Sequence, residues 1–326
     1  MRMLLAPFSL VYYLIAAVRN FFYDKGLFRP RGIGARVISV GNITWGGTGK
    51  TPAVIFIANS LLRNKKQPAI LTRGYGNDEK TLLTDSTRGI PVITGSDRLK
   101  TGRDALNRYS LDTILLDDAF QHRRVKRDLD IVCIDATDPF GNRMVIPAGS
   151  MREGIGGLRR ADIFLLTRAD LVKDPIAVKK LEIKLKDINP RALIVKSVHK
   201  PKSCYKLSDE QLIDMGMLRD KGIALVSAIG NPSSFEKTIL NLGLKFKRHF
   251  VFRDHHWYTE KELKKIKDYC VENNIDTVVT TEKDAVRLKA FSCQLSAVSF
   301  LVLRVELQIT ENEQAFHDRL FGIYNS

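Results

Sequence analysis

The sequence predicts an α/β protein with a doubly wound, mostly parallel sheet and a second, smaller α/β lobe. Short, near-continuous aliphatic runs recur between stretches of helical periodicity, which is typical of parallel strands buried on both faces. A glycine-rich segment joins the first of these runs directly to a helix. The chain has 326 residues, of which 44% are hydrophobic, so it is long enough for two α/β units.

An apolar segment opens the chain. Residues 3–18 are almost wholly apolar, and basic residues interleaved with aromatic rings follow up to residue 31. The run is shorter than the ~20 residues that span a bilayer, and Pro7 interrupts its first turns. A signal peptide and a helix packed on the protein's own core are alternatives. We expect residues 1–30 to form a membrane-interface helix, because aromatic groups enter the acyl boundary while cations contact lipid phosphates.

The glycine-rich segment follows a predicted strand at residues 36–40. It is Thr44-Trp-Gly-Gly-Thr-Gly-Lys-Thr51, and a predicted helix continues from it to residue 63. Small residues let backbone N–H groups surround phosphate oxygens, and a helix N-terminus favours an anion. This order indicates the phosphate-binding loop of a nucleotide triphosphatase or kinase, although Thr44 stands where the first glycine of that motif belongs. Lys50 would contact the β- and γ-phosphates, and Thr51 would ligate Mg²⁺.

The remaining elements follow in order. Aliphatic runs predict further strands of the kinase-type domain, residues 31–200, at residues 67–72, 112–117, 130–135, 162–167 and 192–195. Residues 201–222 are polar, lysine-rich and without periodicity, so they predict a connector. Residues 223–326 predict the smaller lobe, with strands at 223–227, 276–280 and 298–303 and a helix at 259–273, and the last helix is also compatible with packing on the first lobe.

Charge and cysteine content limit the class of partner. The chain has 52 Lys and Arg against 36 Asp and Glu, a net charge of +16, which indicates an acidic partner such as nucleic acid, anionic lipid or a phosphorylated substrate. The four cysteines are far apart and form no C-x-x-C pair. They therefore suggest neither a zinc site nor a disulfide framework, as expected for a reducing cytosol.

Two acidic residues mark a second element of the nucleotide site. Asp117 and Asp118 follow a predicted strand, and open α/β sheets bind their ligands at the carboxyl ends of strands. A carboxylate there is the expected magnesium partner of a phosphate loop, although an ordinary turn is the alternative.

Several ordered motifs together resemble one family. Besides the phosphate loop, they are Thr72-Arg-Gly-Tyr-Gly76, Asp117-Asp-Ala-Phe-Gln-His122, Pro147-Ala-Gly149, Arg152-Glu153, Thr167-Arg-Ala-Asp170, Phe252-Arg-Asp-His-His256 and Thr281-Glu-Lys-Asp284. Nearly the whole chain resembles the tetraacyldisaccharide 4'-kinases. The resemblance implies transfer of the ATP γ-phosphate to the 4'-hydroxyl of an acylated glucosamine disaccharide 1-phosphate, in lipid A synthesis. It also implies a peripheral or monotopic protein at the cytoplasmic face of the bacterial inner membrane.

The resemblance also implies roles for individual residues. It assigns ATP binding to Thr44, Trp45, Gly46, Gly47, Thr48, Gly49, Lys50 and Thr51, and Mg²⁺ to Thr51, Asp117, Asp118 and Gln121. Lys50 and Asp118 are also counted as catalytic, and His255 would work with an aspartate on the sugar hydroxyl. Arg73 and Arg152 are candidates for phosphate or disaccharide contacts. The partners expected are the lipid substrate and an anionic membrane surface, with no nucleic acid and no obligate protein partner.

One departure from the family concerns that aspartate. Family members carry a Gly-Asp-Glu-Pro string between the Arg-Gly-Tyr-Gly loop and the magnesium strand, and this chain has none. Either residues 77–80 (Asn-Asp-Glu-Lys) are its equivalent, which makes Asp78 the base, or residues 77–86 match a preceding variable loop and the motif is deleted. In the second case Asp117 or Asp118 would have to replace the missing aspartate.

Two other functions compete with the lipid kinase. A basic nucleoside triphosphatase acting on nucleic acid is one, but the aromatic residues concentrate in the first thirty residues and no recognition module is present. A kinase-like protein that binds nucleotide and lipid without catalysis is the other, and it rests on the missing acidic string.

Overall fold

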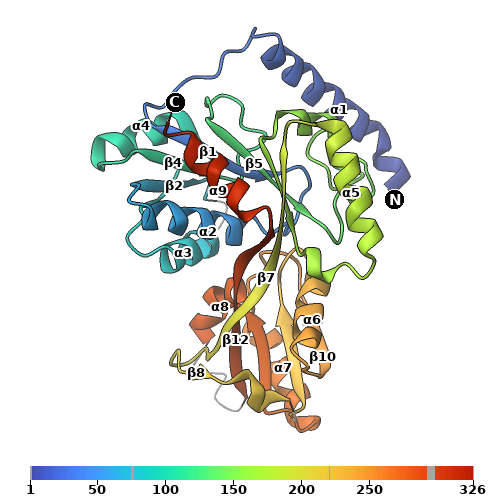
Figure 1. Ribbon diagram of the computed structural model, residues 1–326. Helices are drawn as coiled ribbons and strands as arrows, with labels where there is room; N and C mark the ends of the chain where they lie inside the picture. Colours follow the sequence, from blue (N-terminus) through green and yellow to red (C-terminus); the bar gives the residue numbers. More distant parts are fainter. Residues whose placement is uncertain (1, 75–76, 220, 292–297, 326) are drawn as a thin grey trace. The chain divides into compact units, whose positions relative to one another are not determined.

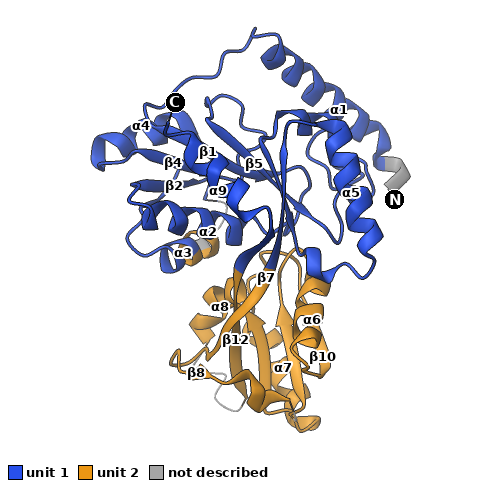
Figure 2. Cartoon of the chain, in the orientation of Figure 1, with its two compact units in different colours: residues 1–75, 83–198, 307–326 blue, residues 76–82, 199–306 orange. Residues whose placement is uncertain are grey.

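The computed structural model describes residues 2–74, 77–219, 221–291 and 298–325, which divide into two compact units (Figure 1, Figure 2). Unit 1 contains Met1–Tyr75, Leu83–Val198 and Leu307–Ser326, and unit 2 contains Gly76–Leu82 and His199–Glu306. Two long strands, β7 and β12, and the helix α3 each belong partly to both units.

Unit 1 is built on a parallel sheet with the strand order β7-β6-β5-β1-β4-β2-β3. The strands are β1 (Arg36–Asn42), β2 (Pro68–Thr72), β3 (Val92–Thr94), β4 (Thr113–Asp117), β5 (Leu129–Asp135), β6 (Ile163–Thr167) and β7 (Leu193–Lys206). The α-helices are α1 (Arg2–Asp24), α2 (Lys50–Arg63), α3 (Asn77–Ser86), α4 (Arg98–Arg108), α5 (Pro175–Ile188) and α9 (Glu313–Gly322), and the 3₁₀ helices are η1 (Ile155–Arg160) and η2 (Ala169–Leu171).

Alternate side chains of the central strands enter different cores. Ile38 and Val40 of β1 pack in one core, with α2 and α9, whereas Val37 belongs to another core with residues of β4 and α4. In β4, Leu115 packs in the first of these cores and Ile114 in the second. The strands are therefore apolar on both faces, as their continuous aliphatic sequence predicts, and the doubly wound α/β fold is confirmed.

Unit 2 repeats this architecture on a smaller scale. Its parallel strands follow the order β10-β9-β11-β12, and β8 pairs with β7 in antiparallel fashion. The bounds are β8 (Leu212–Ile213), β9 (Ile223–Ser227), β10 (Phe246–Val251), β11 (Thr277–Thr281), β12 (Ser299–Glu311), α6 (Pro232–Asn241), α7 (Glu260–Glu272), α8 (Glu282–Leu288) and the 3₁₀ helix η3 (Met215–Leu218).

The structure corrects the predicted connector. Residues 201–222 contain the end of β7, all of β8 and η3, and they belong to unit 2. The first residues of β7 are largely buried, whereas most residues of its second half are partly exposed. A segment of this kind has no continuous aliphatic run, so the sequence does not predict it as a strand. Residues 307–326 belong to unit 1, and Phe316 and Leu320 of α9 are fully buried in its core, which agrees with the alternative in which the last helix packs on the first lobe.

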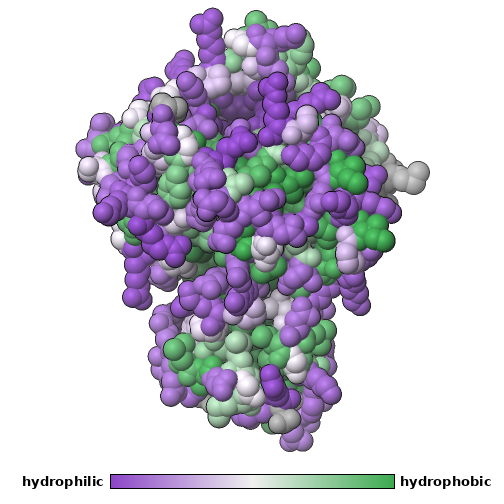
Figure 3. All heavy atoms as spheres, viewed as in Figure 1, coloured by the Kyte–Doolittle hydropathy of each residue, from purple (hydrophilic) through white to green (hydrophobic). Residues whose placement is uncertain are grey.

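Helix α1 is exposed along one side. Large apolar side chains there are half or more exposed, namely Phe8, Leu10, Val11, Leu14, Ile15, Val18 and Phe21. In Figure 3 green spheres lie along the upper right margin, where Figure 1 draws this helix. Residues Leu5–Asp24 are long and apolar enough to cross a membrane, and only 11% of the most apolar window is buried. By itself this is weak evidence of membrane association.

Candidate active site

The phosphate loop joins β1 to α2 in unit 1. Gly49 precedes the helix with a φ of 83°, in the left-handed region that glycine adopts without strain, and α2 begins at Lys50. The amide of Asn42, the last residue of β1, donates to the Thr44 carbonyl at 2.6 Å and to the Thr48 hydroxyl at 2.9 Å. Thr167, at the end of β6, donates to the Thr48 carbonyl at 2.9 Å. The ends of β1 and β6 therefore both hold the loop through hydrogen bonds.

Three predicted residues meet beside this loop. The Asp118 carboxylate lies 2.7 Å from the Arg152 guanidinium and 3.6 Å from the Lys50 ammonium. Burial alone would raise the pKa of Asp118, but the two cations outweigh burial and lower it, so this carboxylate is ionised. The Arg152 guanidinium also lies over the Trp45 ring, 5.7 Å from its centroid.

The other predicted magnesium residues are close in the chain to this group. Asp117 is the last residue of β4 and is buried, and Thr51 is in the first turn of α2. The Gln121 amide donates to the Asn42 carbonyl at 2.9 Å and to Glu153 at 3.0 Å. Among the residues that the structure describes, no group of three or more His, Cys, Asp or Glu side chains forms a metal cage. The oxygen donors present nevertheless suit Mg²⁺, which in phosphate-loop enzymes is bound largely by nucleotide phosphates and water.

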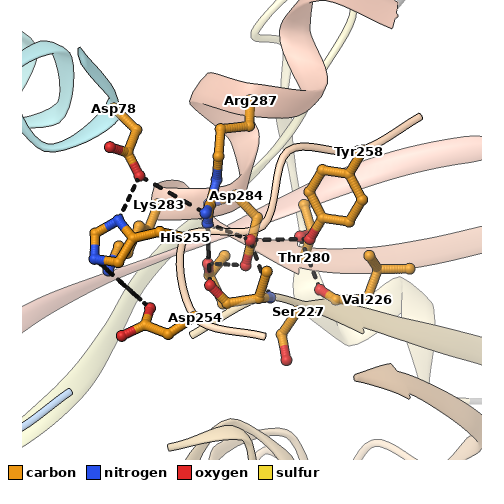
Figure 4. Close-up of polar contacts among 12 residues, drawn as sticks. Asp78, Val226, Ser227, Asp254, His255, Tyr258, Thr280, Lys283, Asp284 and Arg287 are labelled. Carbon is orange, nitrogen blue, oxygen red and sulfur yellow. Dashed lines mark hydrogen bonds and ion pairs between the residues drawn. The ribbon is translucent and has the colours of Figure 1, made fainter. Parts of the chain in front are cut away.

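A second group of predicted residues meets in unit 2. His255, which has a φ of 61°, follows β10, and its Nδ1 lies 3.1 Å from Oδ2 of Asp78 in the first turn of α3 (Figure 4). The two side chains differ in accessibility, since 41% of the His255 side chain is exposed against 2% of Asp78. His255 is therefore the member of the pair that is accessible from solvent.

Charged groups surround the exposed edge of the imidazole. Lys283 Nζ lies 3.0 Å from His255 Nε2 and 3.0 Å from Asp254 Oδ1, and Glu79 lies 3.6 Å from both Lys283 and His255 Nε2. An ammonium group only donates, so Nε2 of neutral His255 accepts from Lys283 and Nδ1 carries the proton shared with Asp78. The hydrogen bond to Asp78 raises the pKa of His255, against the opposing effects of burial and Lys283.

A buried arginine lies behind Asp78. Arg287 of α8 is fully buried, donates to Asp284 at 2.7 Å and lies 3.7 Å from Asp78 Oδ2; Figure 4 shows its side chain reaching toward both carboxylates. Asp284 also accepts hydrogen bonds from Tyr258 and Thr281. Burial would raise the pKa of Asp78, but the His255 hydrogen bond and the charges of His255 and Arg287 lower it to about 2.

A protein-family model matches nearly the whole chain. The family model described as Tetraacyldisaccharide-1-P 4'-kinase matches residues 1–324. The chain belongs to the tetraacyldisaccharide 4'-kinase family. The match includes α1 and both units, so the membership does not depend on the phosphate loop alone.

Curated members of the tetraacyldisaccharide 4'-kinase family are similar over most of their length. The tetraacyldisaccharide 4'-kinase of Syntrophus aciditrophicus is 35% identical over 97% of this chain and 91% of its own length, and that of Bdellovibrio bacteriovorus is 33% identical over 96% of both. Among solved structures, LpxK from Aquifex aeolicus in complex with ATP aligns with a TM-score of 0.73 and 26% identity over 99% of each chain.

The structure brings several of the predicted site residues together. Lys50, Asp118 and Arg152 meet in unit 1, and Asp78 and His255 meet in unit 2, whereas Arg73 follows β2 at an exposed position. Sequence reasoning assigned no role to Arg287, Lys283 or Glu153. Lys283 belongs to the Thr281-Glu-Lys-Asp284 motif, and Glu153 belongs to Arg152-Glu153. Arg287 lies one helical turn beyond Lys283. Proximity to a family motif is therefore the sequence feature by which these three residues could have been found.

Proposed function

We propose that this protein transfers the γ-phosphate of ATP to the 4'-hydroxyl of tetraacyldisaccharide 1-phosphate, in the synthesis of lipid A. The contact between Asp78 and His255 carries the proposal. Because the chain lacks the Gly-Asp-Glu-Pro string, the main alternative is a homologue that binds nucleotide and lipid but has lost catalysis. That alternative requires His255 to lack an acidic partner. Asp78 supplies one, 3.1 Å away.

Unit 1 would bind the nucleotide. The loop from Thr44 to Thr51 offers backbone N–H groups and the N-terminus of α2 to the phosphates, and Lys50 adds a positive charge. Thr51, Asp117, Asp118 and Gln121 would hold Mg²⁺. When bound, Mg²⁺ neutralises charge on the phosphate oxygens.

The acceptor hydroxyl would meet the exposed imidazole of His255. As the hydroxyl oxygen forms its bond to the γ-phosphorus and the bond to the β-phosphate oxygen breaks, the hydroxyl proton would pass to Nε2 of His255 in place of the Lys283 hydrogen bond. The resulting imidazolium stays paired with Asp78 through Nδ1, and ADP leaves. Asp78 is a weak base, because its pKa is about 2. A loose phosphoryl-transfer transition state needs orientation of the nucleophile more than a strong base, so the pair is suited to this task. Arg73 and Arg152 are proposed to contact phosphate or sugar groups.

We further propose that α1 binds the cytoplasmic face of the inner membrane, where a lipid with four acyl chains resides. The exposed apolar side of the helix supports insertion into the interface, and the net charge of +16 supports attraction to anionic headgroups. Anionic headgroups account for the net positive charge, so a nucleic-acid partner is not required to explain it.

The test is transfer of labelled γ-phosphate from Mg-ATP to tetraacyldisaccharide 1-phosphate in detergent micelles. Lys50→Ala should abolish transfer, and Asp78→Asn and His255→Ala should each lower kcat by about 10²- to 10⁴-fold. Asp85→Asn is the matched control, because Asp85 is an exposed carboxylate of the same helix, and it should stay within about twofold of wild type.

Two results would contradict the proposal. A wild-type protein that binds ATP but transfers no phosphate would favour the lapsed homologue. Full activity of Asp78→Asn would remove Asp78 from the reaction, even if the kinase itself is active.

A further inference from the structure

The buried side of α1 makes specific polar contacts with unit 1. A helix that serves only to contact lipid needs apolar packing on its inner side. Here Ser9 donates to the Val145 carbonyl at 2.9 Å and accepts from the Ala148 N–H at 2.8 Å, and only 4% of Ser9 is exposed. Ser9, Tyr12, Ala16 and Asn20 recur at three- and four-residue intervals, so the polar groups of Ser9, Tyr12 and Asn20 share one face of the helix.

The first connection from α1 to the nucleotide site passes through Arg152. The Tyr12 hydroxyl donates to the Arg152 carbonyl at 2.8 Å, and the Arg152 N–H donates to the carbonyl of Ile43, next to the phosphate loop, at 2.8 Å. The guanidinium of the same residue contacts Asp118 and covers Trp45. The position of this backbone segment therefore determines where the guanidinium lies relative to the phosphates.

The second connection passes through Glu153, a fully buried carboxylate. The Asn20 amide donates to Glu153 Oε2 at 2.7 Å, and Arg160 forms an ion pair with Glu153 at 2.9 Å. The other oxygen, Oε1, accepts from Gln121, whose amide also donates to the Asn42 carbonyl. Asn42 in turn holds Thr44 and Thr48 of the loop.

We propose that Tyr12 and Asn20 of α1 are positioning residues for the ATP site, acting through Arg152 and Glu153. The N-terminal helix is then part of the nucleotide-binding structure and not a detachable anchor. Without Asn20, the buried Oε2 of Glu153 loses one of its two donors and keeps only Arg160, so the orientation of the carboxylate toward Gln121 is less constrained. The inference rests on the ATP-binding part of the proposed function.

The experiment measures the Kd of the full-length protein for Mg-ATP by calorimetry in detergent, with no lipid acceptor. Tyr12→Phe removes one hydroxyl and should raise the Kd about threefold to fivefold, and Asn20→Ala should raise it about tenfold. Tyr13→Phe is the matched control: no hydrogen bond of its hydroxyl is present among the described residues, and its Kd should stay within about twofold.

Three further readouts separate positioning from other effects. The KM for ATP should rise while the KM for the acceptor stays unchanged, whereas a purely structural role would lower the melting temperature with the Kd unchanged. Sedimentation with phosphatidylglycerol vesicles should match wild type, because the outer side of α1 is intact.

The inference is overturned if Tyr12→Phe and Asn20→Ala bind ATP as tightly as Tyr13→Phe. A wild-type protein that fails to bind ATP would overturn both this inference and the proposed function. Tight binding by wild type and variants alike would overturn the inference alone.

Discussion

Asp78 is a buried carboxylate whose charge is compensated by Arg287 and, when protonated, by His255. His255 contacts it on the accessible side, and Arg287 lies behind it. An uncompensated charge in this position would be strongly unfavourable, because burial removes its hydration. Asp118 has the same arrangement in unit 1, with Lys50 and Arg152 as its cations. Both candidate catalytic carboxylates are therefore ionised near neutral pH.

The Asp78–His255 pair should make stability depend on pH. The folded-state pKa of His255 is raised, so its contribution is complete below about pH 6.5, the ordinary histidine value, and is lost as the pH rises through the raised pKa. The pKa of Asp78 is lowered from 3.8 to about 2, so its contribution is present above 3.8 and is lost as the pH falls toward 2. We expect His255→Ala to lower the melting temperature more at about pH 5.5 than at about pH 9.

The control for this prediction is the Asp78→Asn background. There His255→Ala should have a much smaller pH-dependent effect, because the carboxylate whose hydrogen bond raises the pKa of His255 most is gone. An equal loss at both pH values in the otherwise wild-type protein would contradict the prediction.

Replacement of Arg287 tests the compensation directly. Arg287→Met leaves the buried carboxylates of Asp284 and Asp78 without their shared cation, so the free energy of unfolding should fall by about 3–5 kcal/mol in a urea titration. Arg219→Met, at an exposed position of the same unit, should change it by about 0.5 kcal/mol or less. A loss below about 1 kcal/mol for Arg287→Met would show that the carboxylates do not depend on this residue.

At the scale of elements, α3 is the segment on which the two alternatives for the missing acidic string depend. Residues 77–86 form a helix with Asp78 and Glu79 in its first turn, where the N-terminal partial charge favours carboxylates. The first of the two sequence alternatives, in which residues 77–80 are the equivalent of the string, agrees with this geometry, and Asp78 as the base stays a proposal.

The passage from β1 into the phosphate loop depends on a close approach to the loop after β4. A Cβ atom added at Gly41 would lie 2.6 Å from both the backbone nitrogen and the Cβ of Phe120. We expect Gly41→Ala to lower the free energy of unfolding by about 1–3 kcal/mol in chemical denaturation, because the two segments must separate.

Gly32→Ala is the control for this substitution, because a Cβ at Gly32 meets no atom within 4 Å. Equal stability of the two variants would indicate that the segments separate without cost.

At the scale of the whole molecule, the net charge and the exposed side of α1 should act together at a membrane. Binding to vesicles that contain anionic lipid should weaken as salt rises, because ions screen the attraction of a +16 protein. Ile15→Glu should weaken binding further at every salt concentration, because it introduces a charge into the apolar side of α1. Co-sedimentation measures both effects.

Ile176→Glu is the matched control for the vesicle experiment. Ile176 of α5 is 62% exposed against 65% for Ile15, so the two substitutions differ mainly in location. Equal losses for both would indicate that binding reflects overall charge and not the helix.

Local sequence determined the central strands, the phosphate loop and the helix after it. These features follow from short-range physics: strands buried on both faces need continuous aliphatic runs, and a loop that surrounds phosphate needs small residues before a helix. The motif order also indicated the family. The same reasoning predicted only the start of β7, at residues 192–195, and missed its second half, because a partly exposed strand carries no such run.

Only the tertiary structure decided which charged groups meet. Asp78 and His255 are 177 residues apart in the sequence, and Asn20 and Glu153 are 133 apart. Neither contact leaves a local pattern, because a buried carboxylate and its partner are brought together by the packing of separate elements. Pairing across the fold sets the ionisation of Asp78 and the contacts of α1, whereas the residues themselves specify only which charges are available to pair.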